Sequence, residues 1–231
     1  MKITWLGHSG FRIEIGGKVL LVDPWFSGNP VFPAERRDEA IAGATHVLIS
    51  HGHFDHIADG PTVAKELGIP LVGIYDTVAW LEKRDGIQGI GFNKGGTVDL
   101  GGVRVTMVNA THSSSLPDDD GRPVYMGTES GYVIEGEDHA IYFSGDTDVM
   151  ADMALIEELH HPDIGILCAG GHFTMDMERA AFAARKFFNF KVVIPCHYRT
   201  FPLLAQSAEP LVRALPEVDV RTPEVMETIE I

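Results

Sequence analysis

The chain has 231 residues, and its 18 lysines and arginines against 33 aspartates and glutamates give a net charge of −15 with histidine neutral. Hydrophobic residues at 45% and charged residues at 22% are typical of a globular protein and exclude a disordered chain. A surface this acidic repels phosphate backbones, so the composition argues against nucleic-acid binding and favours a small-molecule substrate.

The first half of the chain predicts strands at Lys2–Leu6, Phe11–Ile15, Val19–Val22, His46–Ser50 and Leu71–Gly73. These are short β-branched runs bounded by glycine and polar loops. The pair Gly16-Gly17 is typical of a hairpin turn between the second and third strands. Pro61 suits the first turn of a helix that ends near Gly68, and Asp76 is placed to cap a helix through Arg84.

The second half predicts strands at Val103–Val108, Ser130–Ile134, Ala140–Ser144, Ile164–Cys168 and Val192–Cys196. Helical periodicity runs from Val149 to His160. Asp176 can cap a helix over Met177–Phe188, which carries an apolar stripe, and Ser207 can cap a last helix with Pro210 in its first turn. Strands with helices outside them indicate a layered α/β protein, which we expect to be a single domain over 1–231.

Residues that can bind a metal follow strand after strand. They are His8, Asp23, His51, His112, Asp146 and His197. Loops that leave one edge of a rigid sheet are where sites are usually built. The pattern therefore predicts a site at one sheet edge, assembled from residues that are far apart in the sequence.

The strongest signal is the run His51-Gly52-His53-Phe54-Asp55-His56, which holds three of the 11 histidines. His51 and His53 can point the same way and offer two imidazoles to one cation. Asp55 and His56 can offer a carboxylate and an imidazole to a second cation. Neutral imidazole and carboxylate suit zinc, with manganese and iron as close competitors. Adjacent histidines in a glycine-containing loop have no packing rationale, so the run predicts a metal site.

Three further residues complete the candidate ligand set. Asp146, in Ser144-Gly145-Asp146-Thr147-Asp148, offers a carboxylate whose two oxygens can bridge a pair of metal ions. His112 and His197 add imidazoles. Two divalent cations that share a bridging carboxylate and a bridging hydroxide can use the whole set.

The motif H-x-H-x-D-H, followed by a separate His, a bridging Asp and a final His, resembles that of the metallo-β-lactamase superfamily. More narrowly, four segments are similar to a branch of bacterial metal-dependent hydrolases related to ascorbate-6-phosphate lactonase: Trp5–Phe11, Asn93–Gly96, Phe173–Met175 and His197–Pro202. The resemblance runs from about Met1 to Pro202. It implies a four-layer αββα sandwich of two β-sheets with the metals at one edge.

The resemblance also implies a role for each ligand. It places His51, His53 and His112 on the first metal ion, Asp55, His56 and His197 on the second, and Asp146 between them. Asp23 corresponds to an early aspartate that holds the histidine loop, because metal-bound imidazoles usually donate their other N–H to such a partner.

The predicted reaction is hydrolysis of an ester, lactone or phosphodiester by a metal-bound hydroxide. Asp55 is expected to orient the hydroxide and to pass a proton to the leaving atom. His8 is expected to hydrogen-bond the substrate or a developing oxyanion, with a structural histidine at the end of the first strand as the alternative. His172 and Arg199 stand where close relatives tend to carry asparagine, and both are candidates for substrate binding. His172 can face the pocket as an extra donor or merely end a loop, and the loop role is favoured. Arg199 can bind an anionic group bidentately, although a solvated arginine fits the sequence equally well.

The walls of the substrate pocket are expected from Pro24–Arg37 and Ser113–Tyr125. Cys196, beside His197, can bind zinc as a thiolate or point into the core, and we favour the core. Two cysteines imply no disulfide framework, no apolar run approaches the roughly 18 residues of a membrane span, and the N-terminus turns polar too soon for a signal peptide. We expect a cytoplasmic protein, and a homo-oligomer is compatible with the composition.

Three other functions are compatible with this pattern. An iron-dependent oxidoreductase is the first, and a persulfide dioxygenase with one iron would leave Asp55 and His56 without a metal role. The second is a non-catalytic metal-binding module on the same fold. A nuclease is the third, and the acidic chain argues against it because nucleases of this superfamily generally add an RNA-binding arm or domain.

Overall fold

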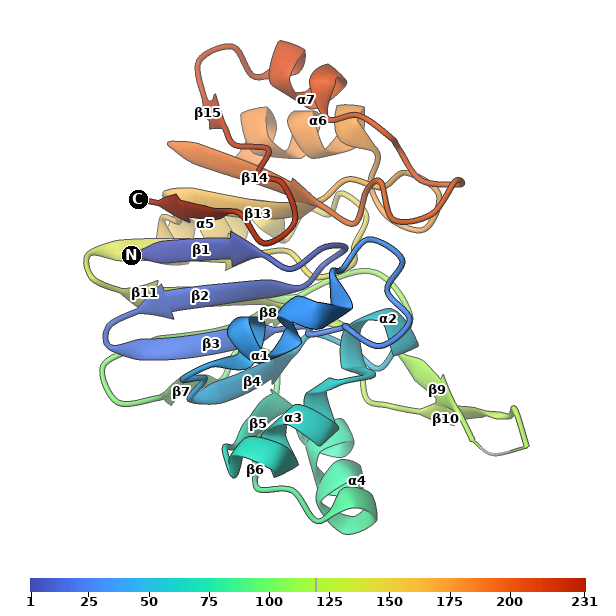
Figure 1. The fold of residues 1–231 in the computed structure, drawn as a ribbon. Coiled ribbons are helices and arrows are strands. Elements are labelled where there is room, and N and C mark those ends of the chain that lie inside the picture. Colours follow the sequence, from blue (N-terminus) through green and yellow to red (C-terminus); the bar gives the residue numbers. More distant parts are fainter. Residues whose placement is uncertain (119) are drawn as a thin grey trace.

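The computed structural model describes residues 1–118 and 120–231, which form two seven-stranded sheets packed face to face (Figure 1). The first sheet runs, in spatial order, β16 (Thr228–Glu230), β1 (Lys2–Trp5), β2 (Phe11–Ile15), β3 (Lys18–Val22), β4 (His46–Ile49), β5 (Leu71–Ile74) and β6 (Gly89–Phe92). The second runs β15 (Asp219–Val220), β14 (Val192–Cys196), β13 (Ile164–Cys168), β12 (His139–Phe143), β11 (Ser130–Gly136), β8 (Arg104–Asn109) and β7 (Thr97–Asp99). A hairpin of β9 (Ser115–Pro117) and β10 (Pro123–Tyr125) stands apart from both.

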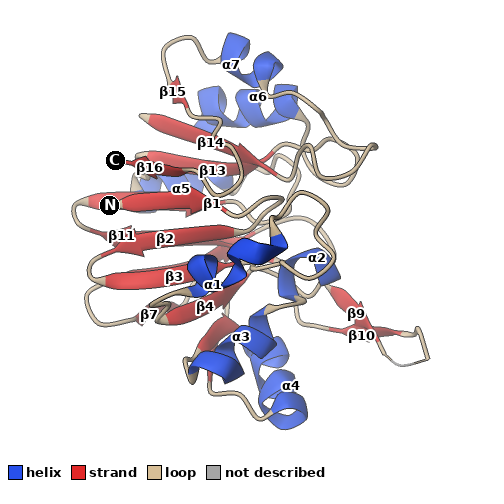
Figure 2. Cartoon of the chain, viewed as in Figure 1, coloured by secondary structure: helices blue, strands red, loops and turns tan. Residues whose placement is uncertain are grey.

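Helices cover the outer faces of the sheets (Figure 2). On the first sheet, α3 (Gly60–Leu67) packs on β4 and β5, and α4 (Tyr75–Asp85) packs on β5 and β6. On the second, α6 (Met177–Phe187) packs on β13 and contacts both α5 (Met153–His160) and α7 (Glu209–Ala214). The short elements are η1 (Ala34–Arg36), α1 (Arg37–Ile41) and α2 (Phe54–Ile57). This helix–sheet–sheet–helix order confirms the predicted αββα sandwich.

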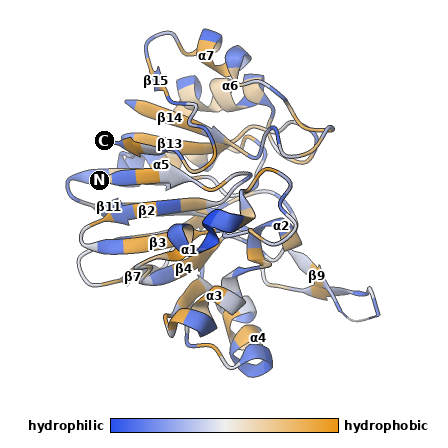
Figure 3. Cartoon of the chain, viewed as in Figure 1, coloured by the Kyte–Doolittle hydropathy of each residue, from blue (hydrophilic) through white to orange (hydrophobic). Residues whose placement is uncertain are grey.

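The main hydrophobic core lies between the two sheets. Strand β2 alternates buried and half-buried residues, and its Phe11 meets Phe143 of the other sheet edge to face at 6.3 Å between ring centroids. The parallel strands β13 and β14 are buried along their whole length, because helices cover their second face. Figure 3 shows hydrophobic residues concentrated in these central strands. The sheets thus form a rigid support for the loops at their edges.

All ten predicted strands are present, with ends shifted by at most two residues. Gly16 and Gly17 form the predicted hairpin turn, with φ of 55° and 71°. Asp176 caps α6 as predicted, because its Oδ1 accepts a hydrogen bond from the Arg179 N–H at 2.7 Å. Asp76 does not cap α4: the helix starts at Tyr75, directly after β5, and Asp76 lies inside its first turn.

The predicted helices otherwise differ only at their ends, since α5 starts at Met153 rather than Val149. Ser207 Oγ accepts from the Glu209 N–H at 3.1 Å, while Ala208 occupies the cap position of α7. Strands β6, β7, β9, β10, β15 and β16 and helices α1 and α2 were not predicted. All of them span two to five residues, too few to show a period. Among the described residues, no helix has both the length and the apolar character that crossing a bilayer requires.

Candidate metal centre

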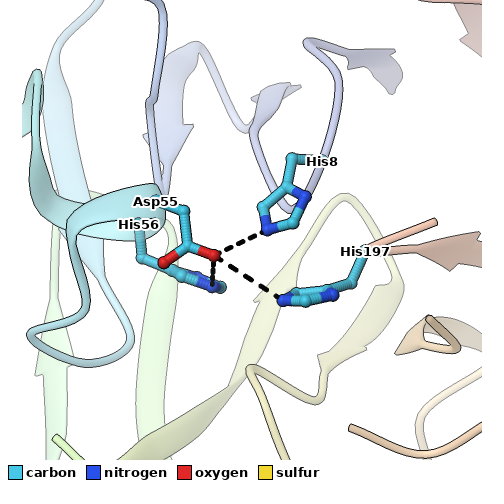
Figure 4. Close-up of side chains that lie close together, drawn as sticks. All are labelled: His8, Asp55, His56 and His197. Carbon is cyan, nitrogen blue, oxygen red and sulfur yellow. Dashed lines mark hydrogen bonds and ion pairs between the residues drawn. The ribbon is translucent and has the colours of Figure 1, made fainter. Parts of the chain in front are cut away.

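The predicted ligands converge at one edge of the sandwich. The loop after β4 brings the run 51–56, and three loops of the second sheet bring His112 after β8, Asp146 after β12 and His197 after β14. Figure 4 shows Asp55 and His56 from the first sheet facing His197 from the second. Residues more than 140 positions apart in the sequence, His56 and His197 among them, thus face one another across this edge.

One group of donors consists of three imidazoles. The ligand atoms of His51, His53 and His112 all lie within 4.8 Å of one another. His51 Nε2 is 3.0 Å from His53 Nδ1, so the two nitrogens point at a common centre. Ser113 Oγ lies 3.2 Å from the other nitrogen of His53 and holds its ring. Three imidazoles with converging nitrogens are a typical zinc-binding set.

A second group combines a carboxylate with imidazoles (Figure 4). Asp55 Oδ2 lies 3.9 Å from His56 Nε2 and 3.8 Å from His197 Nε2. Both rings are buried, and His56 is fixed from behind by a hydrogen bond between its Nδ1 and Asp23 Oδ2 at 2.7 Å. The free edges of these three side chains therefore face the same point.

Asp146 lies between the two groups. Its Oδ2 is 4.0 Å from Nε2 of His51 and 3.6 Å from that of His112 on one side. On the other side it is 3.3 Å from Nε2 of His56 and 3.0 Å from that of His197. The structure thus places one buried carboxylate within reach of donors of both groups.

Asp23 fixes the histidine run 51–56 through hydrogen bonds to Ser50 and His56. Its carboxylate is fully buried at the end of β3 and accepts from the Ser50 N–H at 2.7 Å and the Ser50 hydroxyl at 2.5 Å. It also accepts from the His56 Nδ1–H, which leaves His56 Nε2 as the nitrogen that faces the centre. One side chain therefore ties β4 to β3 and orients a candidate ligand.

His8 lies behind Asp55 rather than at the substrate surface that the sequence predicted for it. Its side chain is fully buried, with Nε2 at 2.9 Å from Asp55 Oδ2 and Nδ1 at 2.9 Å from Thr200 Oγ1. Burial and the neighbouring His197 lower the pKa of His8 to about 4, so the ring is neutral at pH 7. His8 is thus a partner of Asp55.

The protonation states of the three-imidazole group suit cation binding. Burial lowers the pKa values of His51, His53 and His112, so these imidazoles are neutral at pH 7, which is the form that binds a metal. Burial acts the same way on His56, but the carboxylates around it, Asp146 first, raise its pKa well above the ordinary value. A proton on His56 and a cation therefore compete for the same carboxylates.

Unpaired buried atoms provide a test of whether a cation fits. Among the described residues, seven buried side-chain nitrogen and oxygen atoms have no hydrogen-bond partner, and three of them, His56 Nε2, Asp146 Oδ1 and His197 Nδ1, belong to candidate ligands. Each such atom costs about 1–3 kcal/mol when it is left unpaired. All three atoms belong to side chains of the donor set, and His56 Nε2 is the nitrogen of its ring that faces the centre, so the donor set fits a divalent cation.

The backbone around the centre is unusual. Within the described part of the chain, eight non-glycine residues have positive φ, and four of them border the site: His8 (53°), Asp23 (45°), His197 (61°) and Arg199 (63°). A positive φ is uncommon in residues other than glycine, and residues with this conformation recur at functional sites. The sharp turns that they make aim His8 and His197 back toward the end of the sheets.

A cavity of about 640 Å³ opens over the candidate ligands. Besides ligands, it is lined by Phe54, Ser113, Phe173, Phe201, Pro202 and Leu203. Of the two predicted wall segments, only Ser113 lines it directly, and Asp119 in the second segment lies outside the described residues. The loops after β13 and β14 form most of the wall. Because these loops leave the sheet at the same edge as the ligands, the strand order could have predicted that they line the cavity.

The two predicted substrate-binding residues do not line this cavity. Arg199 turns away and pairs with Glu224, with nitrogen–oxygen distances of 3.1 and 3.0 Å. His172 lines a neighbouring hollow instead, together with Asp148 and Arg179. The loops that follow β13 and β14 set these directions, which the local sequence does not encode.

Both cysteines point into the core. Cys168 and Cys196 are buried, and burial raises the pKa of Cys168 from 9.0 to about 12. Cys168 is therefore a neutral thiol at neutral pH. We therefore expect Ellman's reagent to modify neither thiol in the native protein, while both react within minutes in 6 M guanidinium. Stoichiometric modification of the folded chain would contradict this placement.

Comparisons with known proteins agree with the geometry. Residues 18–198 match the beta-lactamase superfamily domain. A UPF0173 metal-dependent hydrolase of Cereibacter sphaeroides is 71% identical over the full length of both chains, and one of Ruegeria pomeroyi is 55% identical over the same extent. The solved metallo hydrolase Igni18 of Ignicoccus hospitalis has a TM-score of 0.86 and 33% identity, over 99% of this chain and 97% of its own. The chain belongs to the beta-lactamase superfamily and, within it, to the UPF0173 metal-dependent hydrolases.

Proposed function

We propose that the chain hydrolyses an ester, lactone or phosphodiester at a pair of divalent cations, zinc first among them. His51, His53 and His112 would hold one cation, and Asp55, His56 and His197 would hold the other, with Asp146 between them. The observation that carries the proposal is the position of Asp146 Oδ2, which lies 3.0–4.0 Å from nitrogens of both donor groups.

Divalent cations bound here would supply Lewis acidity, which makes water a nucleophile at neutral pH and polarises the scissile oxygen. The chain itself orients Asp55. A carboxylate only accepts hydrogen bonds, so the neutral His8 ring donates from Nε2 to Asp55 Oδ2. Its Nδ1 is then an acceptor for the Thr200 hydroxyl at 2.9 Å. The chain Thr200–His8–Asp55 fixes the carboxylate that we propose to accept and return the reaction's proton.

The membership of the chain among metal-dependent hydrolases sets aside an oxidoreductase and a non-catalytic module as primary functions. The geometry agrees, because Asp55 and His56 both face the centre, whereas a single iron held by the three-imidazole group would use neither.

Metal removal tests the proposal. Protein dialysed against a chelator should lose more than about a hundredfold of its activity on a panel of 4-nitrophenyl esters, lactones and bis(4-nitrophenyl) phosphate. Reloading with zinc, manganese or iron should restore activity in proportion to a content of two ions per chain, measured by mass spectrometry. Full activity at one ion per chain, or activity that survives chelation, would contradict the paired-cation assignment.

A further inference from the structure

Three exposed apolar side chains surround the mouth of the cavity over the candidate ligands. Phe54 is 54% exposed, Phe173 is 51% exposed and Leu203 is 65% exposed. They come from separate parts of the chain, the start of α2 and the loops after β13 and β14, yet all three line the same cavity. Single exposed hydrophobic residues are ordinary, but a cluster of them around a concave site marks a surface that binds something apolar.

The apolar wall is held from behind by buried aromatic packing. Trp25 is only 4% exposed and meets Phe54 edge to face at 5.6 Å and Phe201 at 5.8 Å between ring centroids. Its indole N–H is satisfied by Ser27 O at 2.9 Å, so Trp25 has no polar group free for a substrate. The wall is therefore formed before any ligand binds, which lowers the entropic cost of binding.

The same wall offers no positive charge. Among the described residues that line the cavity there is no lysine or arginine. Arg199 is paired with Glu224, and Arg179, beside the neighbouring hollow, is paired with Asp148 at 2.7 Å. A substrate that carries an anionic group away from the candidate metal centre would therefore place that group against apolar side chains, on a protein of net charge −15.

We propose that the substrate is a carboxylic ester or lactone whose acyl group is uncharged and apolar, seated against Phe54, Phe173, Phe201 and Leu203. This rests on the proposed hydrolytic function and narrows its substrate class. In the reaction, water adds to the acyl carbon and the bond from that carbon to the ester oxygen breaks. The leaving oxygen takes one proton of the water, and the acid product releases the other.

The test compares acyl chains of different length. With zinc-loaded protein, kcat/KM should rise about two- to fourfold for each methylene added from 4-nitrophenyl acetate to the octanoate, because each one is buried against the wall. The succinate monoester of 4-nitrophenol, which carries a carboxylate at the far end, should be a poorer substrate than the hexanoate. Bis(4-nitrophenyl) phosphate should be poorer than any of the longer esters.

Binding of alkyl hydroxamates gives a readout without turnover. Calorimetry should show that octanohydroxamate binds at least about thirtyfold more tightly than acetohydroxamate, since both share the head group and differ only in the apolar chain.

A lysine placed at the cavity mouth sharpens the test. The variant Leu203→Lys should lose at least about tenfold of the octanoate-to-acetate preference and gain on the succinate monoester. The matched control is Leu159→Lys, because Leu159 is a 73% exposed leucine on α5 that does not line the cavity. The control should keep the preference of the unmodified chain.

The outcomes separate this inference from the function on which it rests. Ester hydrolysis with no chain-length preference, or faster cleavage of the phosphodiester, would overturn the apolar acyl site and leave the hydrolytic centre standing. Preferential binding of octanohydroxamate by a protein that hydrolyses none of the panel would support the apolar site and overturn the proposed reaction. Equal affinity for the two hydroxamates would overturn the apolar site.

Discussion

Replacing Asp146 by alanine is expected to abolish most of the activity, with a fall in kcat/KM of more than about a hundredfold. Loss of a residue that only supports a metal ligand typically costs 10- to 100-fold, and Asp146 lies within 4.0 Å of donors of both groups. Its removal should loosen both cations at once. Mass spectrometry of the purified variant should therefore find fewer than one ion per chain, alongside the kinetic loss.

The control for this experiment lies two residues further along the chain. Asp148 is a half-exposed carboxylate that pairs with Arg179 at the surface, so Asp148→Ala should keep both ions and change the rate less than twofold. Circular dichroism should show both variants folded. If Asp146→Ala retains two ions and its rate, Asp146 is not shared between the cations.

Replacing Asp23 by alanine is expected to lower the free energy of unfolding by about 3–5 kcal/mol. The change leaves the N–H and hydroxyl of Ser50 and the Nδ1–H of His56 buried without their acceptor. It also frees the His56 ring to rotate, so metal affinity should fall about 10- to 100-fold. Urea titration of the metal-free chain measures the first effect, and competition with a chromophoric chelator measures the second.

An asparagine at the same position separates the two effects. Asp23 has a φ of 45°, which asparagine tolerates better than alanine, and the amide oxygen can still accept from Ser50. Asp23→Asn should therefore recover most of the stability but only part of the metal affinity. A loss of less than about 1 kcal/mol in the alanine variant would show that Asp23 does not hold the loop.

The sequence was sufficient to predict the fold class and the sheet edge at which the candidate metal ligands meet. Buried strands such as Ile164–Cys168 are continuous apolar runs, which have a clear local signal. The histidine run 51–56 is also local, and its position after a strand predicted the edge at which it lies. Strand β16 shows the opposite case: its three residues form a strand only because β1 is there to pair with them.

Side-chain direction was the part that the sequence could not supply. His8 and Arg199 both follow strands at the edge where the candidate ligands lie, and both have a positive φ. As a result, the His8 ring lies behind Asp55, and the Arg199 guanidinium pairs with Glu224. These directions depend on partners 25 to 47 residues away, so no local pattern reports them. The apolar wall was missed for the same reason, since its members converge only in the folded chain.

The left-handed backbone at His8 and His197 has a cost for the molecule as a whole. A residue held in this region gives up on the order of 1–3 kcal/mol, which the surrounding packing must offset. Selection for thermostable variants of this chain would therefore favour glycine at these two positions. Such variants would be more stable at high temperature but would lose the imidazole rings of the candidate metal centre. Stability and function therefore place opposite demands on these two residues.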